Sequence, residues 1–160
     1  GARVIGVVRR PEPYAGFACA PVEIVDASAG DVATRVREMT GGKGADIVYN
    51  TVGDPYFQDA HKSLALKGRQ ILISAIDKIV QFNIFEFYRG RHTYVGIDSL
   101  GMNSIETGAV LRDLLPGFES GKLKPFPIVE SAIYPLSKAA EAYVAVMGSA
   151  RDRVIFDPKR

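Results

Sequence analysis

Two adjacent arginines, Arg9 and Arg10, directly follow an apolar, β-branched run at residues 4–8. A strand that ends in two cations can bind a phosphate group, because a guanidinium donates paired, charge-assisted hydrogen bonds to phosphate oxygens. The alternative is a strand that simply ends in two solvated arginines.

Metal-ligating and nucleophilic residues are scarce. The sequence has one cysteine, Cys19, and two isolated histidines, His61 and His92. These offer no recognisable zinc ligand set, although carboxylates alone could hold a harder ion. No histidine or clear base accompanies Cys19 nearby in sequence, which favours a packing role over a nucleophilic one. We therefore predict no metal site and expect both histidines to be surface or half-buried residues.

Composition bounds the class of protein. A chain of 160 residues with 47% apolar residues is large enough for one compact core. The 20 basic and 18 acidic residues nearly balance, which argues against a nucleic-acid partner. No apolar stretch approaches the roughly 20 residues that cross a bilayer, and no cleavable signal segment is present. A single cysteine excludes an internal disulfide, so we expect a cytoplasmic protein with no membrane partner.

Short apolar runs alternate with segments of helical spacing. Most of the runs are continuous, as in strands buried on both faces. They cover residues 3–8, 22–27, 46–51, 69–74, 93–98 and 153–157. Four helices are expected between the runs. The first begins at a capping box of Ser28 and Asp31 and ends at Gly41, and the second begins at Asp54 and Pro55 and ends at Gly68, with Phe57, Ala60 and Leu64 inward. The third begins near Ser104 and kinks or ends at Pro116, and the fourth begins at a cap at Ser137.

This alternation predicts parallel strands joined by right-handed crossovers, hence an α/β fold with a doubly wound parallel sheet. At residues 11–21, three prolines and a glycine allow at most a short or distorted helix. In such folds the carboxyl ends of the strands surround the ligand crevice. The turn at Thr51, Val52 and Gly53 is therefore a candidate ligand contact, and an ordinary strand-to-helix turn is equally consistent with it.

Five segments carry a resemblance that is more specific than the pattern of strands and helices. They are GARVIGVV (1–8), TGGKGADIVYNTVG (40–53), LALKGRQILIS (64–74), ESGKLKPFP (119–127) and YPLSKAAEAYVAV (134–146). Together they resemble the C-terminal half of the medium-chain dehydrogenase/reductase superfamily. Within it, the chain is most similar to the zinc-independent quinone oxidoreductase branch. The resemblance implies a Rossmann-type domain that binds NADP(H).

The resemblance also implies that residues 1–160 form only part of that domain. In relatives, the strand equivalent to residues 3–8 is preceded by a first strand, a glycine-rich turn and a helix, and no G-x-G-x-x-G occurs here. The N-terminal GroES-like catalytic domain is absent as well. In the usual 3-2-1-4-5-6 strand order, the missing strand lies between the strands at 3–8 and 46–51. Without it, the strands at 3–8 and 46–51 should pair directly with each other, or another chain should fill the gap between them, or the sheet should be rearranged.

Specific cofactor contacts are implied by the same resemblance. Zinc-dependent relatives carry an aspartate at the place of Val8, so its absence favours a 2′-phosphate at Arg9 and Arg10. Many relatives hold this end of the cofactor with a tyrosine where this chain has Ala27. The remaining implied contacts are Ser74, Ala75 and Ile76 beside the nicotinamide; Ile97, Asp98 and Ser99 over its ring; and Arg153, in a position where relatives carry the lysine of a Gly-Lys pair.

These features predict part of an oxidoreductase. Hydride would pass between NADPH and a small-molecule substrate, namely a quinone, an enone or a similar carbonyl, without zinc. No catalytic residue can be named, and these 160 residues alone are expected to be inactive. The resemblance places a homodimer seam at the strand near 93–98, which an ordinary edge strand with a polar exit would also explain. The alternative function is a noncatalytic nucleotide-binding or self-associating module.

Overall fold

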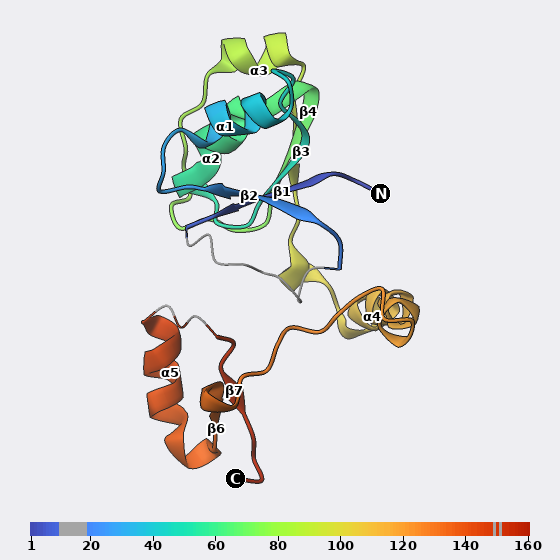
Figure 1. Cartoon of the computed structure of the whole chain (residues 1–160), viewed down its shortest axis with the longest axis vertical. Helices are drawn as coiled ribbons and strands as arrows, with labels where there is room; N and C mark the ends of the chain where they lie inside the picture. Colours follow the sequence, from blue (N-terminus) through green and yellow to red (C-terminus); the bar gives the residue numbers. More distant parts are fainter. Residues whose placement is uncertain (10–18, 149, 151) are drawn as a thin grey trace. The chain divides into compact units, whose positions relative to one another are not determined.

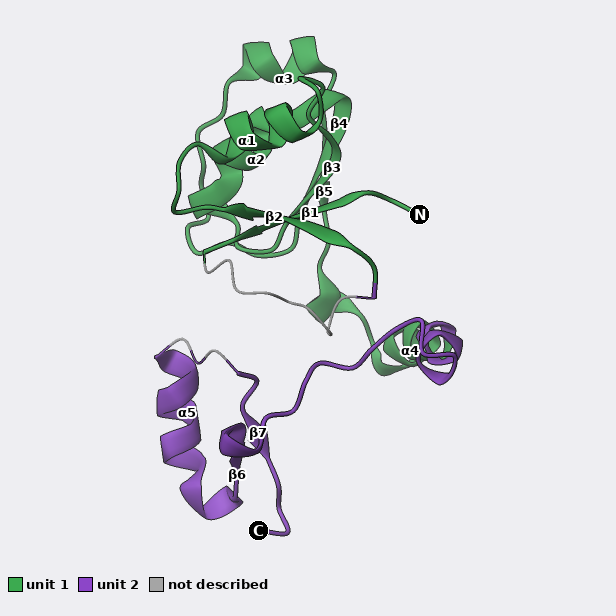
Figure 2. Cartoon of the chain, in the orientation of Figure 1, with its two compact units in different colours: residues 1–13, 20–112 green, residues 14–19, 113–160 purple. Residues whose placement is uncertain are grey.

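The computed structural model describes residues 1–9, 19–148, 150 and 152–160 (Figure 1). The chain divides into two compact units, residues 1–13 with 20–112, and residues 14–19 with 113–160 (Figure 2). Most of the distorted helix expected within 11–21 falls outside the described residues. The prediction that residues 1–160 form one partial Rossmann domain stays a prediction.

Five strands of unit 1 form two parallel sheets. In one sheet β1 (Val4–Val8) pairs with β2 (Val22–Asp26). The other has the order β3 (Ala45–Asn50), β4 (Leu64–Leu72), β5 (Thr93–Gly96). The parallel α/β fold is thus confirmed. Within the described residues β1 and β3 do not pair with each other, so direct pairing, one of the three expected arrangements, is wrong.

The helix α1 (Val32–Met39) packs on the sheet of β1 and β2. Val32 and Val36 are buried with Val25 of β2 in a small apolar cluster. Its cap differs from the expected box: the Asp31 carboxylate itself accepts a hydrogen bond from the Thr34 amide at 2.7 Å. Ser28 instead lies in the preceding turn, where its amide and hydroxyl donate to Asp26.

The second expected helix is much shorter than predicted. A 3-10 turn, η1 (Asp54–Tyr56), leads into α2 (Phe57–Lys62), and β4 already begins at Leu64. Leu64 is buried as expected, but in a strand. A Cβ at Gly68 would lie 2.8 Å from the Ala65 carbonyl oxygen. This close backbone approach explains the glycine better than a helix end does.

One further helix was not predicted, and another extends past its predicted end. The helix α3 (Ile84–Gly90) was not predicted; Asn83 caps it by accepting from the amides of Phe85 and Glu86. The helix α4 (Ser104–Glu119) continues past Pro116, so the predicted end there is wrong, while the alternative of a kink at Pro116 stays a prediction. The Ser120 amide and hydroxyl both donate hydrogen bonds to the Pro116 carbonyl at the end of the helix.

The described part of unit 2 contains a short parallel pair and a helix. β6 (Ile133–Tyr134) pairs with β7 (Ile155–Phe156), which is shorter than the strand expected at 153–157. The helix α5 (Ala139–Met147) follows a 3-10 turn, η4 (Leu136–Lys138). Ser137 lies inside η4 and does not cap α5, so that prediction is wrong. Two more 3-10 turns are η2 (Ser99–Gly101), in unit 1, and η3 (Glu130–Ala132).

Candidate functional site

The carboxyl ends of β3, β4 and β5 meet at one edge of their sheet. Asn50 is in register with Leu72, and Leu72 with Gly96, so the three strands finish side by side. The segments that leave them are residues 51–53, 73–77 and 97–99, which we call the rim. The structure therefore brings together three of the groups predicted from the sequence.

Arg9 lies at the corresponding end of the other sheet. It follows β1 and is exposed, whereas Arg10 lies outside the described residues. The helix α1 returns the chain from the end of β2 to the start of β1, where Arg3 donates to the Met39 carbonyl at 2.7 Å. β3 begins shortly afterwards, at Ala45. Arg9 therefore lies at the carboxyl end of β1, the end opposite to Arg3.

The turn after β3 is held by Asn50. Its Oδ1 accepts hydrogen bonds from the amides of Val52 at 3.1 Å and Gly53 at 2.8 Å, and its Nδ2 donates to the Gly53 carbonyl. Gly53 has a φ of 98°, in the left-handed half of the map. A Cβ there would lie 2.4 Å from the Ser74 carbonyl oxygen and 2.7 Å from Ala75 Cα. The two turns therefore touch backbone to backbone, which only glycine permits.

Asp54 joins the same two segments through its side chain. One carboxylate oxygen, Oδ1, accepts hydrogen bonds from the amides of Ile76 at 2.7 Å and Asp77 at 2.8 Å. Desolvation raises the pKa of this carboxyl, but the two amide hydrogen bonds outweigh it and hold the pKa below its ordinary value. The sequence indicated only a helix cap at Asp54, and the structure shows it as the first residue of η1 instead.

The segment after β5 completes the rim. The Ile97 amide donates to the Leu72 carbonyl at 2.9 Å, which keeps the chain beside β4. Asp98 accepts from the amides of Leu100 and Gly101, so its carboxylate caps η2, and Ser99 is the first residue of that turn. Exposed apolar side chains stand on all three segments of the rim: Val52, Ile76 and Ile97.

Arg153 lies in unit 2, apart from these segments in the sequence. Its guanidinium carbon lies 4.4 Å from the centre of the Phe126 ring, a cation–π contact within unit 2. Its predicted contact with a cofactor stays a prediction.

A polar cluster behind the sheet was missed by the sequence analysis. His61 is buried, and its Nδ1 is hydrogen-bonded to the Tyr94 hydroxyl at 2.8 Å. Its Nε2 lies 3.5 Å from a carboxylate oxygen of Glu86, and the His92 ring lies 5.1 Å away between centroids. Burial lowers the pKa of His61 and raises the pKa of Tyr94 to about 12. The expectation of a surface or half-buried residue is therefore wrong for His61, and His92 is partly buried as expected.

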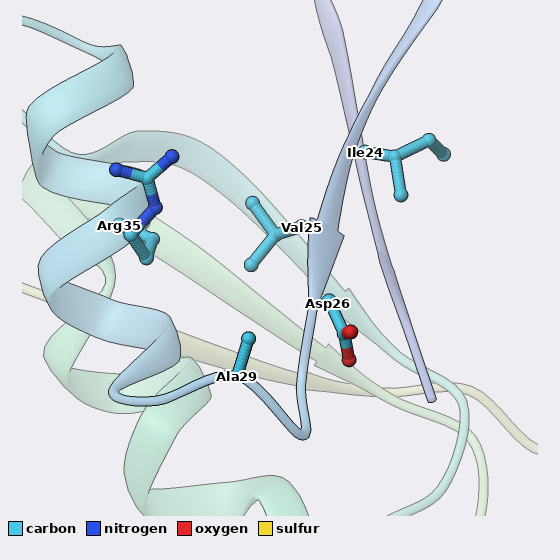
Figure 3. Close-up of a pocket in the computed structure, with 5 residues that line it drawn as sticks. All are labelled: Ile24, Val25, Asp26, Ala29 and Arg35. Carbon is cyan, nitrogen blue, oxygen red and sulfur yellow. The ribbon is translucent and has the colours of Figure 1, made fainter. Parts of the chain in front are cut away.

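A small pocket of about 240 Å³ lies beside β2 and α1 (Figure 3). Val25 points from β2 toward α1, which carries Arg35, and Ile24 lies on the other side of the strand. Asp26, another residue that lines the pocket, is already bonded to Ser28. The pocket is below the range of about 300–1,000 Å³ typical of small-molecule sites, and none of the predicted contacts lines it.

In unit 1, the strands β3, β4 and β5 are parallel, and the exposed turns that follow them lie at one edge of the sheet. This arrangement is typical of α/β folds that bind ligands at the ends of their strands. A family model described as "Zinc-binding dehydrogenase" matches residues 1–112. The chain belongs to this family, within the medium-chain dehydrogenase/reductase superfamily, and the resemblance stated from its sequence is confirmed.

Curated relatives agree with this assignment. A mycocerosic acid synthase-like polyketide synthase of Mycobacterium tuberculosis is 34% identical over 130 residues, which cover 79% of this chain and 6% of that protein. A zinc-type alcohol dehydrogenase-like protein of Schizosaccharomyces pombe is 31% identical over 94 residues, covering 56% of this chain and 28% of that protein. The chain thus spans a small part of each of these relatives.

Solved structures match nearly the whole chain. A quinone oxidoreductase of Pseudomonas syringae has a TM-score of 0.76 and 28% identity, over 98% of this chain and 48% of that one. The Escherichia coli quinone oxidoreductase complexed with NADPH has a TM-score of 0.77 and 19% identity, over 99% and 50%. At that identity the second likeness shows the fold alone. The chain spans about half the length of these enzymes.

The family description names zinc, so we tested whether the residues present suit that ion. Within the described ranges, no group of three or more His, Cys, Asp or Glu side chains could hold a metal. Of the two neighbouring histidines, His61 is hydrogen-bonded to the Tyr94 hydroxyl and lies 3.5 Å from a carboxylate oxygen of Glu86. A separate finding concerns membranes: among the residues that the structure describes, no helix has both the length and the apolar character to cross a bilayer.

Proposed function

We propose that this chain supplies part of the dinucleotide site of an NADP(H)-dependent oxidoreductase that transfers hydride between NADPH and a quinone, an enone or a similar carbonyl. The observation that carries the proposal is the backbone contact between Gly53 and Ser74–Ala75 at the carboxyl ends of β3 and β4. A flat ligand laid across strand ends needs such low, side-chain-free turns. The Escherichia coli relative, complexed with NADPH, supports the choice of cofactor.

Charge along the strand ends supports one orientation of the cofactor. Arg9, beside β1, would hold the 2′-phosphate, together with Arg10. The rim instead carries the carboxylates of Asp77 and Asp98, which disfavour a phosphate there. The nicotinamide would lie against Ser74–Ile76 and Ile97–Ser99, where exposed apolar side chains can cover a ring. The bound cofactor supplies the hydride chemistry, and this chain's residues bind and orient it.

We also propose four properties of the whole protein. The reaction uses no zinc held by this chain, and the protein acts in the cytoplasm. The fold is a Rossmann-type domain in which the unpaired edges of β1 and β3 flank the place of one more strand. β5, an edge strand of its sheet, forms a homodimer seam. A chain that sediments only as a monomer at high micromolar concentration would contradict the seam.

Calorimetric titration of the chain with NADPH and NADH tests the proposal. We expect NADPH to bind more tightly, and Arg9→Ala to weaken NADPH about tenfold or more while leaving NADH unchanged, because one charge-assisted contact is lost. Arg89→Ala removes an exposed arginine of α3 and serves as the control. Equal affinities for the two cofactors, or no binding of either, would contradict the proposal.

A second function is favoured by a separate observation. The helix α4 buries none of its residues, and its apolar side chains, including Leu111, Leu114 and Leu115, are exposed. Such a surface suits a noncatalytic, self-associating module. Dimerisation that persists in a chain with no affinity for either dinucleotide would favour this function over the first.

A further inference from the structure

We propose that Asp54 is a positioning residue of the candidate cofactor site, which holds the loop after β4 against the turn after β3 and thereby sets the affinity for the dinucleotide. This inference rests on the proposed function. It concerns a residue that would act through the backbone of its neighbours rather than by touching the cofactor.

The contact is tertiary and not a local turn. Asp54 belongs to the connection from β3 to α2, whereas Ile76 and Asp77 belong to the connection from β4 to α3. The partners are 22 and 23 residues away in sequence. The side chain therefore links the connection after β3 to the connection after β4, which lie far apart in the sequence.

The first half of the loop it holds has little other support. Between Leu72 at the end of β4 and Ile84 at the start of α3, the described chain has no helix or strand. Its far end is held by Gln58, whose side chain donates to the Gln81 carbonyl, and by Phe82, whose ring packs against aromatic rings of α2, α3 and β5. Ile76 and Ile79 are largely exposed, so apolar packing does not fasten the middle of the loop. Asp54 is the polar contact that fixes its first half.

The turn on the other side of the contact is held independently. Asn50 binds the Val52 and Gly53 amides and the Gly53 carbonyl, with all partners in its own turn. Loss of the Asp54 carboxylate should therefore free residues 74–77 and leave residues 51–53 in place. This difference gives the inference a local readout.

The geometry also provides a conservative substitution. Both amides donate to the same oxygen, Oδ1. An asparagine side chain carries one carbonyl oxygen that can accept both bonds, whereas alanine carries none. Asp54→Asn should thus preserve the loop, and Asp54→Ala should release it. Asp46→Ala, which removes an exposed carboxylate from β3, is the matched control.

The test combines amide hydrogen exchange, measured by NMR on the 160-residue chain without cofactor, with titration by NADPH. In Asp54→Ala we expect exchange of the Ile76 and Asp77 amides to rise about tenfold or more, while the Val52 and Gly53 amides keep the wild-type rate. NADPH affinity should fall about tenfold, and Asp54→Asn should restore both quantities to within about threefold of wild type.

Each outcome decides the inference. Unchanged exchange at Ile76 and Asp77 in Asp54→Ala overturns it, as does faster exchange with unchanged NADPH affinity, and in both cases the proposed function stands. If the wild-type chain binds no dinucleotide, the proposed function fails and the positioning role falls with it, whatever the exchange rates are. Rescue by Asp54→Asn excludes a general loss of folding as the cause.

Discussion

At the scale of single residues, Gly53 places the strongest constraint on the rim. Its positive φ favours glycine, and its close contact with the Ser74 carbonyl separately leaves no room for a side chain. Alanine at this position would carry the backbone strain and also push the two turns apart. We therefore treat the residue as essential to the shape of the candidate site.

Gly53→Ala should destabilise the chain by about 2–4 kcal/mol, since strain at a positive φ costs on the order of 1 kcal/mol and the steric overlap adds more. Urea denaturation measures the loss. Gly42→Ala isolates the first contribution, because Gly42 also has a positive φ but has open space around it. Equal losses in the two variants would show that the contact at Ser74 contributes nothing.

The buried histidine predicts how stability depends on pH. Burial lowers the pKa of His61 below its ordinary value of 6.5, and it lowers the pKa of His92 as well. Below pH 6.5 the unfolded chain therefore binds protons that the folded chain resists, and the free energy of unfolding should fall as the pH falls. The slope should fade above that pH, as the histidines of the unfolded chain lose their remaining protons.

Denaturation curves between pH 5 and 8, a range chosen to bracket the ordinary histidine pKa of about 6.5, measure this slope. His61→Gln should flatten it. Glu86→Gln should steepen it, because the Glu86 carboxylate raises the pKa of His61 and opposes the effect of burial. A His61→Gln variant with the wild-type slope would place the titration elsewhere.

The sequence predicted part of this residue-scale description. Gly53 was recognisable because a glycine after a buried strand and before a helix is typical of a close approach. The role of Asn50 was not predicted, although asparagine side chains commonly bond to the backbone of their own turn. The role of Asp54 could not be predicted, because its two partners lie 22 and 23 residues away and offer only backbone amides.

At the scale of elements, the strands were more predictable than the helices. Continuous apolar runs identified β1 to β5. The expected burial on both faces is wrong for β1, β2 and β3, where Val7, Ile24 and Ile47 are exposed. The run at Leu64–Leu66 is too short for periodicity to separate a helix end from a strand start, and the strand pairing with β3 decided it. The helix α3 has only seven residues and was missed, although Asn83 marks its start.

The connection from α1 to the sheet depends on Arg37. Its guanidinium donates to the carbonyls of Lys62, Gly42 and Leu64 at 3.0, 3.2 and 3.1 Å. Arg37→Ala should lower the free energy of unfolding by about 1–2 kcal/mol, because the carbonyls are partly accessible to water and recover some hydrogen bonding. Chemical denaturation checks this value.

Arg37→Lys is the matched comparison. It retains the charge but cannot span three carbonyls with a fixed planar group, so we expect most of the loss to remain. Full stability in Arg37→Lys would mean that charge and not hydrogen-bond geometry holds α1 in place.

At the scale of the whole molecule, the chain corresponds to only part of each protein that it matches. It spans about half the length of the quinone oxidoreductases it matches in structure. The described part of unit 1 keeps the carboxyl-end edge of a parallel sheet, and it leaves β1 and β3 unpaired with each other. No sequence pattern could predict the pairing partners of β1 and β3, because pairing depends on which other strands are present to compete for their edges.

The proposed account requires the dinucleotide to lie across the strand ends of unit 1, and amide chemical shifts on addition of NADPH test this most directly. We predict that saturating NADPH shifts the amides of residues 51–53, 74–77 and 97–99 together with Arg9, and leaves those of the pocket at Ile24, Val25 and Ala29 unchanged. Shifts confined to the pocket beside β2, with the rim unaffected at saturation, would contradict the account.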